Sequence, residues 1–259
     1  MQAIILAGGA QSTINNEYEG IPKPMVEIGG RPLLWHIMQN FSRHGIQDFI
    51  ICGGYKIDVI KQYFTDYYIY ESDITVDLQN NSIQIHKKKT ENWNVSVIDT
   101  GLHSTHGRRI SMIEKYIDGD AFLVSYGDCL SNINITELIK THKSHGKCAT
   151  LTMAKPIGRN MLLPINAVGE LKYDVHSDIA QNDAWINADC FIFNKEVFPY
   201  IQGDFDLEDQ LLVTLSKEGQ IATYCHNGYW RAIETRRDLL AAETLWQKKQ
   251  APWMEWRNT

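Results

Sequence analysis

The stretch Ala3-Ile4-Ile5-Leu6-Ala7-Gly8-Gly9 is an apolar run that ends on two adjacent glycines. Short apolar runs that contain β-branched residues and stop at glycine are typical of buried parallel strands. Glycine lets the backbone approach a ligand closely, and the N–H groups of such a turn can bind a phosphate or a base. The run therefore predicts a central strand, with Gly8 and Gly9 as nucleotide-binding candidates at its carboxyl end.

The same pattern recurs along the chain and predicts an α/β fold. Residues 48–52 and 121–126 are apolar strands that end at Gly53-Gly54 and Gly127-Asp128. Further strand patterns cover 149–154 and 186–193, half-exposed ones cover 83–86 and 95–98, and helical patterns cover 32–42, 57–64, 108–116, 135–145, 207–218 and 235–250. The alternation indicates a doubly wound, mainly parallel sheet flanked by helices. We expect one domain over residues 1–259, with a helical extension at its C-terminal end.

Composition limits the function classes. The 259 residues are 44% hydrophobic and 22% charged, and the formal net charge of −6 argues against broad nucleic-acid binding. Five cysteines without C-x-x-C spacing indicate free thiols in a reducing compartment. Residues 3–7 are too short for a signal peptide, and no apolar stretch approaches the roughly 20 residues of a membrane span. We expect a cytoplasmic protein with neither nucleic acid nor membrane as a partner.

Two side chains are candidate catalytic residues. Lys23 lies between two prolines, which pre-set a cation near the end of the first strand. Asp128 follows the strand 121–126, and the carboxyl ends of parallel strands are where ligands bind in open α/β sheets. A carboxylate there suits Mg²⁺, although a strand-end Asp can also cap a following helix. Together with the glycines, Lys23 favours the metal-binding interpretation of Asp128.

Arg109 and Glu234 are further candidates. Arg109 belongs to Gly107-Arg108-Arg109, and arginine can bond phosphate oxygens in two places. An arginine pair alone is better explained as a solvated helix start, but the preceding Asp99-Thr100-Gly101 strengthens the phosphate interpretation. Glu234 is a possible second carboxylate for the metal. On its own it is better explained as an acid at a helix N-terminus, favourable by about 0.3–1 kcal/mol.

Several other chemistries lack their motifs. The nine histidines form neither H-x-x-x-H nor H-E-x-x-H, so a zinc hydrolase is not supported. There is no G-x-S-x-G for acyl transfer and no G-x-G-x-x-G after the first strand for a dinucleotide cofactor. Gly8-Gly9 is not followed by Gly-Lys-Ser/Thr, so it is not a Walker A loop.

Motifs spread over nearly the whole chain resemble the sugar-phosphate nucleotidyltransferase family, and within it the glucose-1-phosphate cytidylyltransferases. They are Lys23-Pro24-Met25-Val26-Glu27-Ile28-Gly29-Gly30, Leu34-Trp35-His36-Ile37-Met38, Asp48 to Lys56, Trp93-Asn94-Val95, Asp99-Thr100-Gly101, Tyr126-Gly127-Asp128 and Ala251-Pro252-Trp253. The resemblance implies a Rossmann-like, mixed and mainly parallel sheet. It also implies a homo-oligomer.

The resemblance also implies a reaction and a set of site residues. In the family, CTP lies over the first-strand glycines, and a sugar phosphate attacks its α-phosphate and releases pyrophosphate. Mg²⁺ is held by an Asp that matches Asp128 and by a second Asp near the chain end. Lys23, Arg109 and Asn187 occupy matching positions, which makes Asn187 a substrate-binding candidate.

The chain departs from the family at charged positions. The glycine-loop Arg falls on Thr13 and the glycine two places before it on Gln11. The Glu-Lys-Pro that holds the sugar phosphate falls on Ser177-Asp178-Ile179, the second metal Asp on Glu234, and the glycine facing the sugar on Met161. Charge-stabilising donors in such sites are worth about 2.7–4 kcal/mol each, so the ordinary reaction is expected to be strongly impaired.

Three functions remain open at this stage. The first is an active enzyme with an altered acceptor, in which Lys172, Arg159 or Arg231 could replace a lost cation. The second is a catalytically silent relative that binds nucleotide or sugar, or regulates a partner. The third, a glycosyltransferase-like protein, is opposed by the lack of Asp-x-Asp at Asp128-Cys129-Leu130. The retention of Lys23, Arg109 and Asp128 favours the enzyme.

Overall fold

A computed structural model describes residues 1–9, 14, 20–87, 91–155, 185–201, 203 and 205–254 of the chain. Several positions on which the sequence comparison rests lie outside these ranges: Gln11, Thr13, Arg159, Met161, Lys172 and Ser177-Asp178-Ile179.

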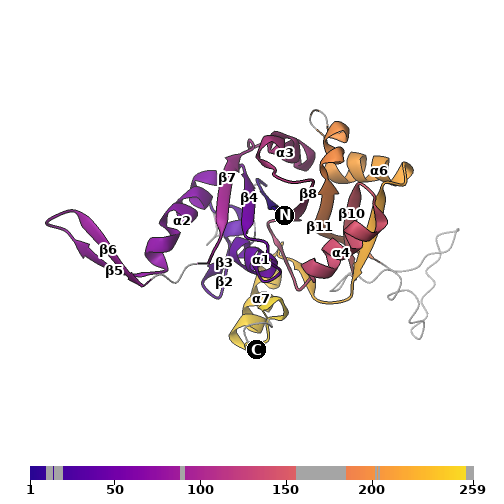
Figure 1. The fold of residues 1–259 in the computed structure, drawn as a ribbon. Helices are drawn as coiled ribbons and strands as arrows, with labels where there is room; N and C mark the ends of the chain where they lie inside the picture. Colours follow the sequence, from indigo (N-terminus) through magenta and orange to yellow (C-terminus); the bar gives the residue numbers. More distant parts are fainter. Residues whose placement is uncertain are drawn as a thin grey trace.

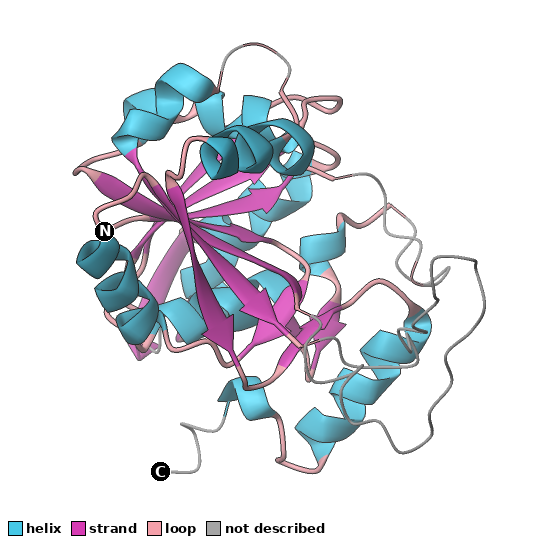
Figure 2. Ribbon diagram, turned by 90° about the vertical axis from the view of Figure 1, so that its right-hand side faces the viewer, coloured by secondary structure: helices cyan, strands magenta, loops and turns pink. Residues whose placement is uncertain are grey.

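A seven-stranded sheet forms the centre of the fold (Figures 1 and 2). From one edge to the other its strands are β12 (Ile221–His226), β10 (Ala149–Ala154), β11 (Ile186–Asn194), β8 (Ala121–Tyr126), β1 (Ala3–Ala7), β4 (Asp48–Gly53) and β7 (Asn94–Asp99). β11 runs antiparallel to both of its neighbours, and every other pair is parallel. The prediction of a mixed, mainly parallel sheet is confirmed.

Helices cover both faces of this sheet. One face packs against α1 (Leu33–Ser42), α2 (Ile57–Tyr70) and α4 (Ile135–His145). The other packs against α3 (His106–Met112), the 3-10 helices η3 (Glu114–Tyr116) and η4 (Lys195–Tyr200), the π-helical η5 (Leu207–Leu212) and α6 (Val213–Lys217). The helices predicted at 32–42 and 135–145 are confirmed to within one residue.

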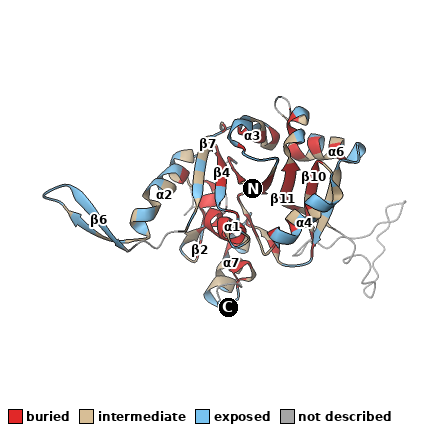
Figure 3. Ribbon diagram, viewed as in Figure 1, coloured by how far each residue is buried: buried red, intermediate tan, exposed pale blue. Residues whose placement is uncertain are grey.

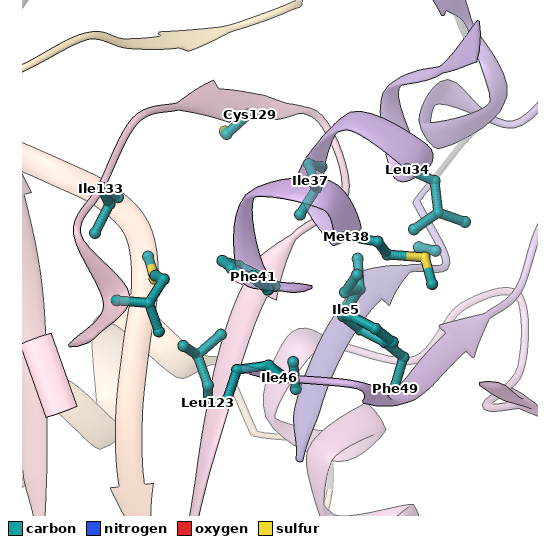
Figure 4. Close-up of a cluster of buried hydrophobic side chains, with 14 of the residues drawn as sticks. Ile5, Leu34, Ile37, Met38, Phe41, Ile46, Phe49, Leu123, Cys129 and Ile133 are labelled. Atoms are coloured by element: carbon teal, nitrogen blue, oxygen red, sulfur yellow. The ribbon is translucent and has the colours of Figure 1, made fainter. Parts of the chain in front are cut away.

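β1 contributes to the hydrophobic core on both faces. Ile5 packs into the first cluster, where α1 lays Ile37, Met38 and Phe41 against the sheet (Figure 4). Ile4 points the opposite way into the second cluster, as the two-residue repeat of a strand requires. Every β1 residue is at most 6% exposed. The strand therefore sits at the buried centre of the sheet, as its apolar sequence predicts.

A third cluster ties the C-terminal part to the start of the chain. α7 (Arg236–Gln247) begins with a capping box, in which Thr235 and Asp238 each accept a hydrogen bond from the other's backbone N–H. The helix packs beside the short hairpin of β2 (Glu27–Ile28) and β3 (Arg31–Pro32), and the Gly29 N–H donates to Glu243 Oε2 at 2.8 Å. Trp35 and Trp253, both at most 1% exposed, fill the centre of this cluster.

Three helical segments differ from their predicted form. The helix predicted over 108–116 is divided into α3 and the 3-10 helix η3. α2 continues to Tyr70 instead of ending at Phe64, because Tyr67 is held by Glu91 and by the Trp35 indole. The segment predicted as one helix over 207–218 begins as a π-helix and becomes α-helical only at Val213. The extension of α2 has no local sequence signal, since it depends on contacts with residues distant in sequence.

Beyond α2 the chain forms an arm that extends away from the sheet (Figures 1 and 3). The arm consists of β5 (Asp73–Asp77) and β6 (Ser82–Lys87), joined through a turn in which Asn81 has a φ of 51°. The cross-strand pairs Ile74↔Ile85 and Val76↔Ile83 place four apolar side chains on one face of the arm. Val76 and Ile83 are 49% and 54% exposed. An isolated two-stranded ribbon is only marginally stable in water, so this apolar face lacks a cover within the described chain.

All five cysteines are free thiols, as predicted. In the part of the chain described here, no helix has the length and apolar character needed to cross a membrane.

The β2–β3 turn generates a stability prediction. Gly29 and Gly30 both have positive φ, 59° and 73°, but a Cβ on Gly29 would lie 1.9 Å from the Trp246 indole nitrogen, whereas a Cβ on Gly30 meets no atom within 4 Å. Gly30→Ala should cost only the backbone penalty of about 1–2 kcal/mol. Gly29→Ala should cost clearly more, because Trp246 must also move. Urea unfolding of the two variants measures the difference, and equal losses would contradict the packing described for α7.

Candidate functional site

The candidate site forms where the ends of β1 and β8 meet the loop that carries Lys23. Lys23 begins the 3-10 helix η2 (Lys23–Met25), and its Nζ lies 2.8 Å from Asp128 Oδ2. The two side chains are 27% and 23% exposed. Burial lowers the pKa of Lys23, but the Asp128 carboxylate, with a smaller contribution from Glu234, raises it above its usual value. Lys23 is therefore a charged ammonium held at the strand ends.

Gly127 allows this close approach. Its N–H donates to the Leu6 carbonyl at 3.1 Å, which fixes the end of β8 beside the end of β1. A Cβ at this position would lie 2.8 Å from Pro24 Cγ. A larger residue would therefore push away the loop that carries Lys23. The Tyr126-Gly127-Asp128 motif positions the Lys23 loop as well as the carboxylate.

Glu234 reaches the same place from the other end of the chain. β13 (Trp230–Ala232) pairs with β9 (Cys129–Ser131), with Ala232 opposite Cys129. The next residue, Ile233, donates its N–H to the Asp128 carbonyl at 2.9 Å. The sequence alone favoured Glu234 as an acid at the N-terminus of the last helix, and Glu234 does lie directly before Thr235, the N-cap of α7. Its charge also raises the pKa of Lys23.

Arg109 lies beneath the site. Its side chain is buried, with 3% of the residue exposed, and it donates to oxygen atoms of three loops. Nη2 lies 2.7 Å from the Gly8 carbonyl, and Nη1 lies 2.7 Å from both Thr100 Oγ1 and the Gly101 carbonyl. Burial lowers its pKa, which the nearby Cys52 and Asp99 partly offset. The prediction of an arginine open to phosphate does not describe this conformation, because the guanidinium already binds protein oxygens.

The two predicted glycines differ in their surroundings. A Cβ on Gly8 would lie 2.0 Å from Arg109 Nη1, whereas a Cβ on Gly9 would meet no atom within 4 Å. Gly8 is therefore required for the contact with Arg109. Within the described part of the chain, nothing occupies the space beside Gly9 at the end of the strand, so a ligand of this loop would have room there.

Asn187 lies at the same edge, because the antiparallel β11 begins where β8 ends. Its Oδ1 accepts the N–H of Asp189 at 2.9 Å. Asp189 has a φ of 53°, a conformation that is uncommon outside glycine, and its Oδ2 accepts the Cys129 thiol at 3.1 Å. Burial, together with the charges of Asp128 and Glu208, raises the pKa of Asp189 to about 6. The sequence analysis missed this carboxyl group.

A second missed group is formed by Tyr126, His106 and Glu208. The Tyr126 hydroxyl lies 2.9 Å from His106 Nδ1 and donates to Glu208. The three come from β8, α3 and η5, and His106 and Glu208 both act on the pKa of Asp189. No spacing in the sequence connects them, since only the packing of α3 against η5 brings them together. Asp189 could have been noticed as a polar residue in a buried strand.

The carboxylates suit a magnesium ion that brings its own ligands. Among the described residues no three His, Cys, Asp or Glu side chains are placed to hold a metal by themselves. Mg²⁺ is usually bound by one or two carboxylates together with phosphate oxygens and water. Asp128 and Glu234 carry hard carboxylate oxygens, and the hydrogen bond from the Ile233 N–H to the Asp128 carbonyl connects their two loops. This donor set fits Mg²⁺ delivered with a nucleotide and does not fit a resident structural metal.

A cavity of about 590 Å³ lies elsewhere, lined by Gly29, Glu243, Trp246, Gln247, Lys249, Ala251 and Met254. None of the predicted site residues lines it. We therefore place the functional site at the strand ends, where the charged residues gather.

The fold and this edge of charged residues define an α/β nucleotide-binding protein, and comparison with known sequences places it more narrowly. The sequence profile described as "Nucleotidyl transferase" matches residues 2–160. Glucose-1-phosphate cytidylyltransferase of Salmonella typhimurium is 43% identical over 258 residues, which cover 99% of this chain and 100% of that protein. The probable glucose-1-phosphate cytidylyltransferase of Bacillus subtilis is 35% identical over the same lengths. The chain belongs to the sugar-phosphate nucleotidyltransferase family.

Solved structures agree on the fold. The crystal structure of HddC from Yersinia pseudotuberculosis superposes with a TM-score of 0.67 at 22% identity, covering 95% of this chain and 99% of that one. The predicted fold class is confirmed.

Asp189 generates a pH prediction. Because its pKa rises from 3.8 to about 6 on folding, the folded protein binds a proton more tightly than the unfolded chain between these values. Its contribution to the free energy of unfolding therefore falls as pH rises from about 4 to about 6. In metal-free protein, Asp189→Asn should remove this fall and stabilise the fold at pH 7 by up to about 3 kcal/mol. Asparagine also tolerates the positive φ.

Urea unfolding at pH 4, 5, 6 and 7 in the presence of a chelator measures the effect. Asp73→Asn on the exposed arm is the matched control and should leave the pH profile unchanged. Parallel profiles for the natural protein and Asp189→Asn would show that this carboxyl group titrates normally.

Proposed function

We propose that this protein transfers a nucleotidyl group from a nucleoside triphosphate, preferably CTP, to a sugar phosphate or a related phosphorylated acceptor. The observation that carries the proposal is the convergence of Lys23, Asp128 and Glu234 at the carboxyl ends of β1 and β8. Ligands bind at this edge in open α/β sheets. The names of the two relatives, a cytidylyltransferase and a probable one, support CTP as the donor.

In the proposed reaction an oxygen of the acceptor phosphate attacks the α-phosphorus of CTP. A new P–O bond forms as the bond to the bridging oxygen of the β-phosphate breaks, and pyrophosphate leaves with that electron pair. Catalysis of such transfers is mainly positioning and charge stabilisation. In this proposal Lys23 offsets the negative charge of the phosphates. The backbone of Gly8 and Gly9 binds the nucleotide, and Asn187 binds the acceptor. Arg109 belongs to the same nucleotide site, where it acts on the nucleotide indirectly.

Asp128 and Glu234 are the proposed magnesium ligands. When bound, Mg²⁺ would neutralise charge on the phosphate oxygens. Glutamate is longer than the family's aspartate, but an ion that retains water ligands can accept the longer side chain. The Lys23–Asp128 pair brings a cation and a metal ligand to the same phosphate group.

The acceptor is proposed to differ from glucose 1-phosphate, or the turnover to be much reduced. Asp178 stands where the family has a lysine for the sugar phosphate, and Thr13 stands where it has an arginine. Two like charges about 4 Å apart at an effective dielectric near 20 oppose each other by about 4 kcal/mol. An acceptor phosphate beside Asp178 would therefore bind nearly a thousandfold more weakly.

The same substitutions support an alternative, a catalytically inactive relative that binds nucleotide or sugar, or regulates a partner. The presence of Lys23, Asp128 and Glu234 in one cluster favours the enzyme. Metal-dependent binding without pyrophosphate release would select the inactive relative.

We further propose a homo-oligomer located in the cytoplasm. The exposed apolar face of the β5–β6 arm supports association, because a second copy would remove Val76 and Ile83 from water. Sedimentation of the natural chain measures the assembly. The free cysteines support a reducing compartment.

The magnesium site generates a binding prediction. Asp128→Asn should abolish the magnesium-dependent part of CTP binding, because it removes a charged ligand and frees Lys23. Asp120→Asn is the matched control, since Asp120 is exposed and precedes the opposite end of β8. At about 100 times its dissociation constant, CTP with Mg²⁺ should stabilise the natural protein by about 2.7 kcal/mol. Thermal unfolding with CTP, with and without Mg²⁺, reads the effect. Equal stabilisation of Asp128→Asn and the natural protein would rule out this ligand assignment.

The departures from the family generate a rescue prediction. The natural protein should make CDP-glucose from CTP and glucose 1-phosphate very slowly or not at all. Gln11→Gly, Thr13→Arg and Asp178→Lys together should raise pyrophosphate release measurably, while each alone should do little because the groups act as a unit. A coupled pyrophosphate assay with both substrates measures the rate. Family-typical turnover by the natural protein would make these substitutions neutral.

A further inference from the structure

Arg109 connects three loops at the carboxyl ends of neighbouring strands. Its guanidinium donates to the Gly8 carbonyl after β1, to the Gly53 carbonyl at the end of β4, and to Thr100 Oγ1, Gly101 and Leu102 after β7. Thr100 Oγ1 in turn donates to the Gly53 carbonyl at 2.7 Å. One side chain from α3 therefore holds together the backbone around the predicted nucleotide loop.

The packing around this contact leaves no room for a side chain. A Cβ on Gly8 would lie 2.0 Å from Arg109 Nη1. A Cβ on Gly54 would lie 2.8 Å from the Gly8 and Gly101 carbonyl oxygens and 3.0 Å from Nη1. The glycines after β1 and β4 are thus explained by Arg109 itself, without reference to a ligand.

The charge of Arg109 is balanced by backbone dipoles. Among the described residues it forms no ion pair within 4.0 Å, and all but one of its acceptors are peptide carbonyls. In a trans peptide the C=O and the following N–H point in opposite directions. Because the Gly8 carbonyl points toward Arg109, the Gly9 N–H points away from it. A Cβ on Gly9 would meet no atom of the described residues within 4 Å, so the described chain leaves room beside Gly9 for an anion or a base.

We propose that Arg109 is a positioning residue, which acts on the nucleotide through the Gly8–Gly9 peptide and not by direct contact with phosphate. Arg109 binds carbonyl oxygens of the three loops on one side of the Gly8–Gly9 peptide. The Gly9 N–H therefore faces the opposite side of that peptide. This positioning role rests on the proposed function, because that function identifies the ligand as a nucleotide. A direct phosphate contact would require Arg109 to exchange its bonds to five protein oxygens for bonds to the ligand.

The test combines hydrogen exchange of the nucleotide-free protein with CTP titration in the presence of Mg²⁺. Arg109→Lys keeps a positive charge but loses the planar fork that reaches several carbonyls. Gly8→Ala keeps the arginine but occupies the position of Nη1. Each should speed exchange of segments 6–9, 52–54 and 99–102 and weaken CTP binding by about tenfold or more, since a hydrogen bond to a charged group contributes at least about 1.4 kcal/mol.

The double variant should be no worse than the more severe single one, because both substitutions break the same contact. Arg108→Lys is the matched control: this arginine is exposed on the same helix and should change neither readout. If Gly8→Ala does not fold, Thr100→Val takes its place in the test. It removes one acceptor with little change in volume, and it should shift both readouts in the same direction by a smaller factor.

The outcomes distinguish a failure of the positioning role of Arg109 from a failure of the proposed function. Weaker CTP binding by Arg109→Lys with unchanged loop exchange would overturn the proposal and identify Arg109 as a direct phosphate ligand. Unchanged exchange in both single variants would also overturn it. If the natural protein binds no nucleoside triphosphate, the proposed function fails, while faster loop exchange in Arg109→Lys would still establish that this residue holds the loops.

Discussion

The burial of β1 on both faces is the constraint on which the rest of the structure depends. Ile4 and Ile5 point into different clusters, so helices must cover both sides of the sheet. A strand covered on both faces can meet solvent only at its ends. Its carboxyl end is where Gly8 turns, where Gly127 donates to Leu6, and where Lys23 reaches Asp128. The location of the site thus follows from the way the core is built.

The sequence predicted most of this framework, because apolar periodicity reports burial directly. Strands β1, β4 and β8 were recognised by their apolar runs and terminal glycines, and α1 and α4 by their apolar faces. The failures share a cause. α2 extends to Tyr70 through contacts of Tyr67 with residues distant in sequence, and such contacts leave no trace in local spacing.

The sequence predicted the individual site residues, but not how they are arranged in space. Lys23 and Asp128 lie 105 positions apart and form an ion pair. The β9–β13 pairing brings Glu234 toward them, although its local sequence suggested only an acid at a helix N-terminus. Arg109 was recognised as important, yet its residue type suggested an open phosphate ligand where the structure has a buried donor to carbonyls. Side-chain chemistry can be read from sequence, whereas the direction in which a side chain points depends on packing.

The balance of charge at the strand ends bears on what the site can accept. Lys23 is already paired with Asp128, while Asp189 and Glu208 add carboxyl groups on the side of β11 and η5. A triphosphate entering this edge meets these acidic groups, and two like charges about 4 Å apart at an effective dielectric near 20 oppose each other by about 4 kcal/mol. A magnesium ion that travels with the nucleotide would offset this repulsion, and so would a cation outside the described residues such as Arg159 or Lys172. A neutral acceptor hydroxyl could also donate to Asp189, which stays protonated below about pH 6 in the free protein. The protein's own acidic groups therefore help to set how much positive charge the site needs.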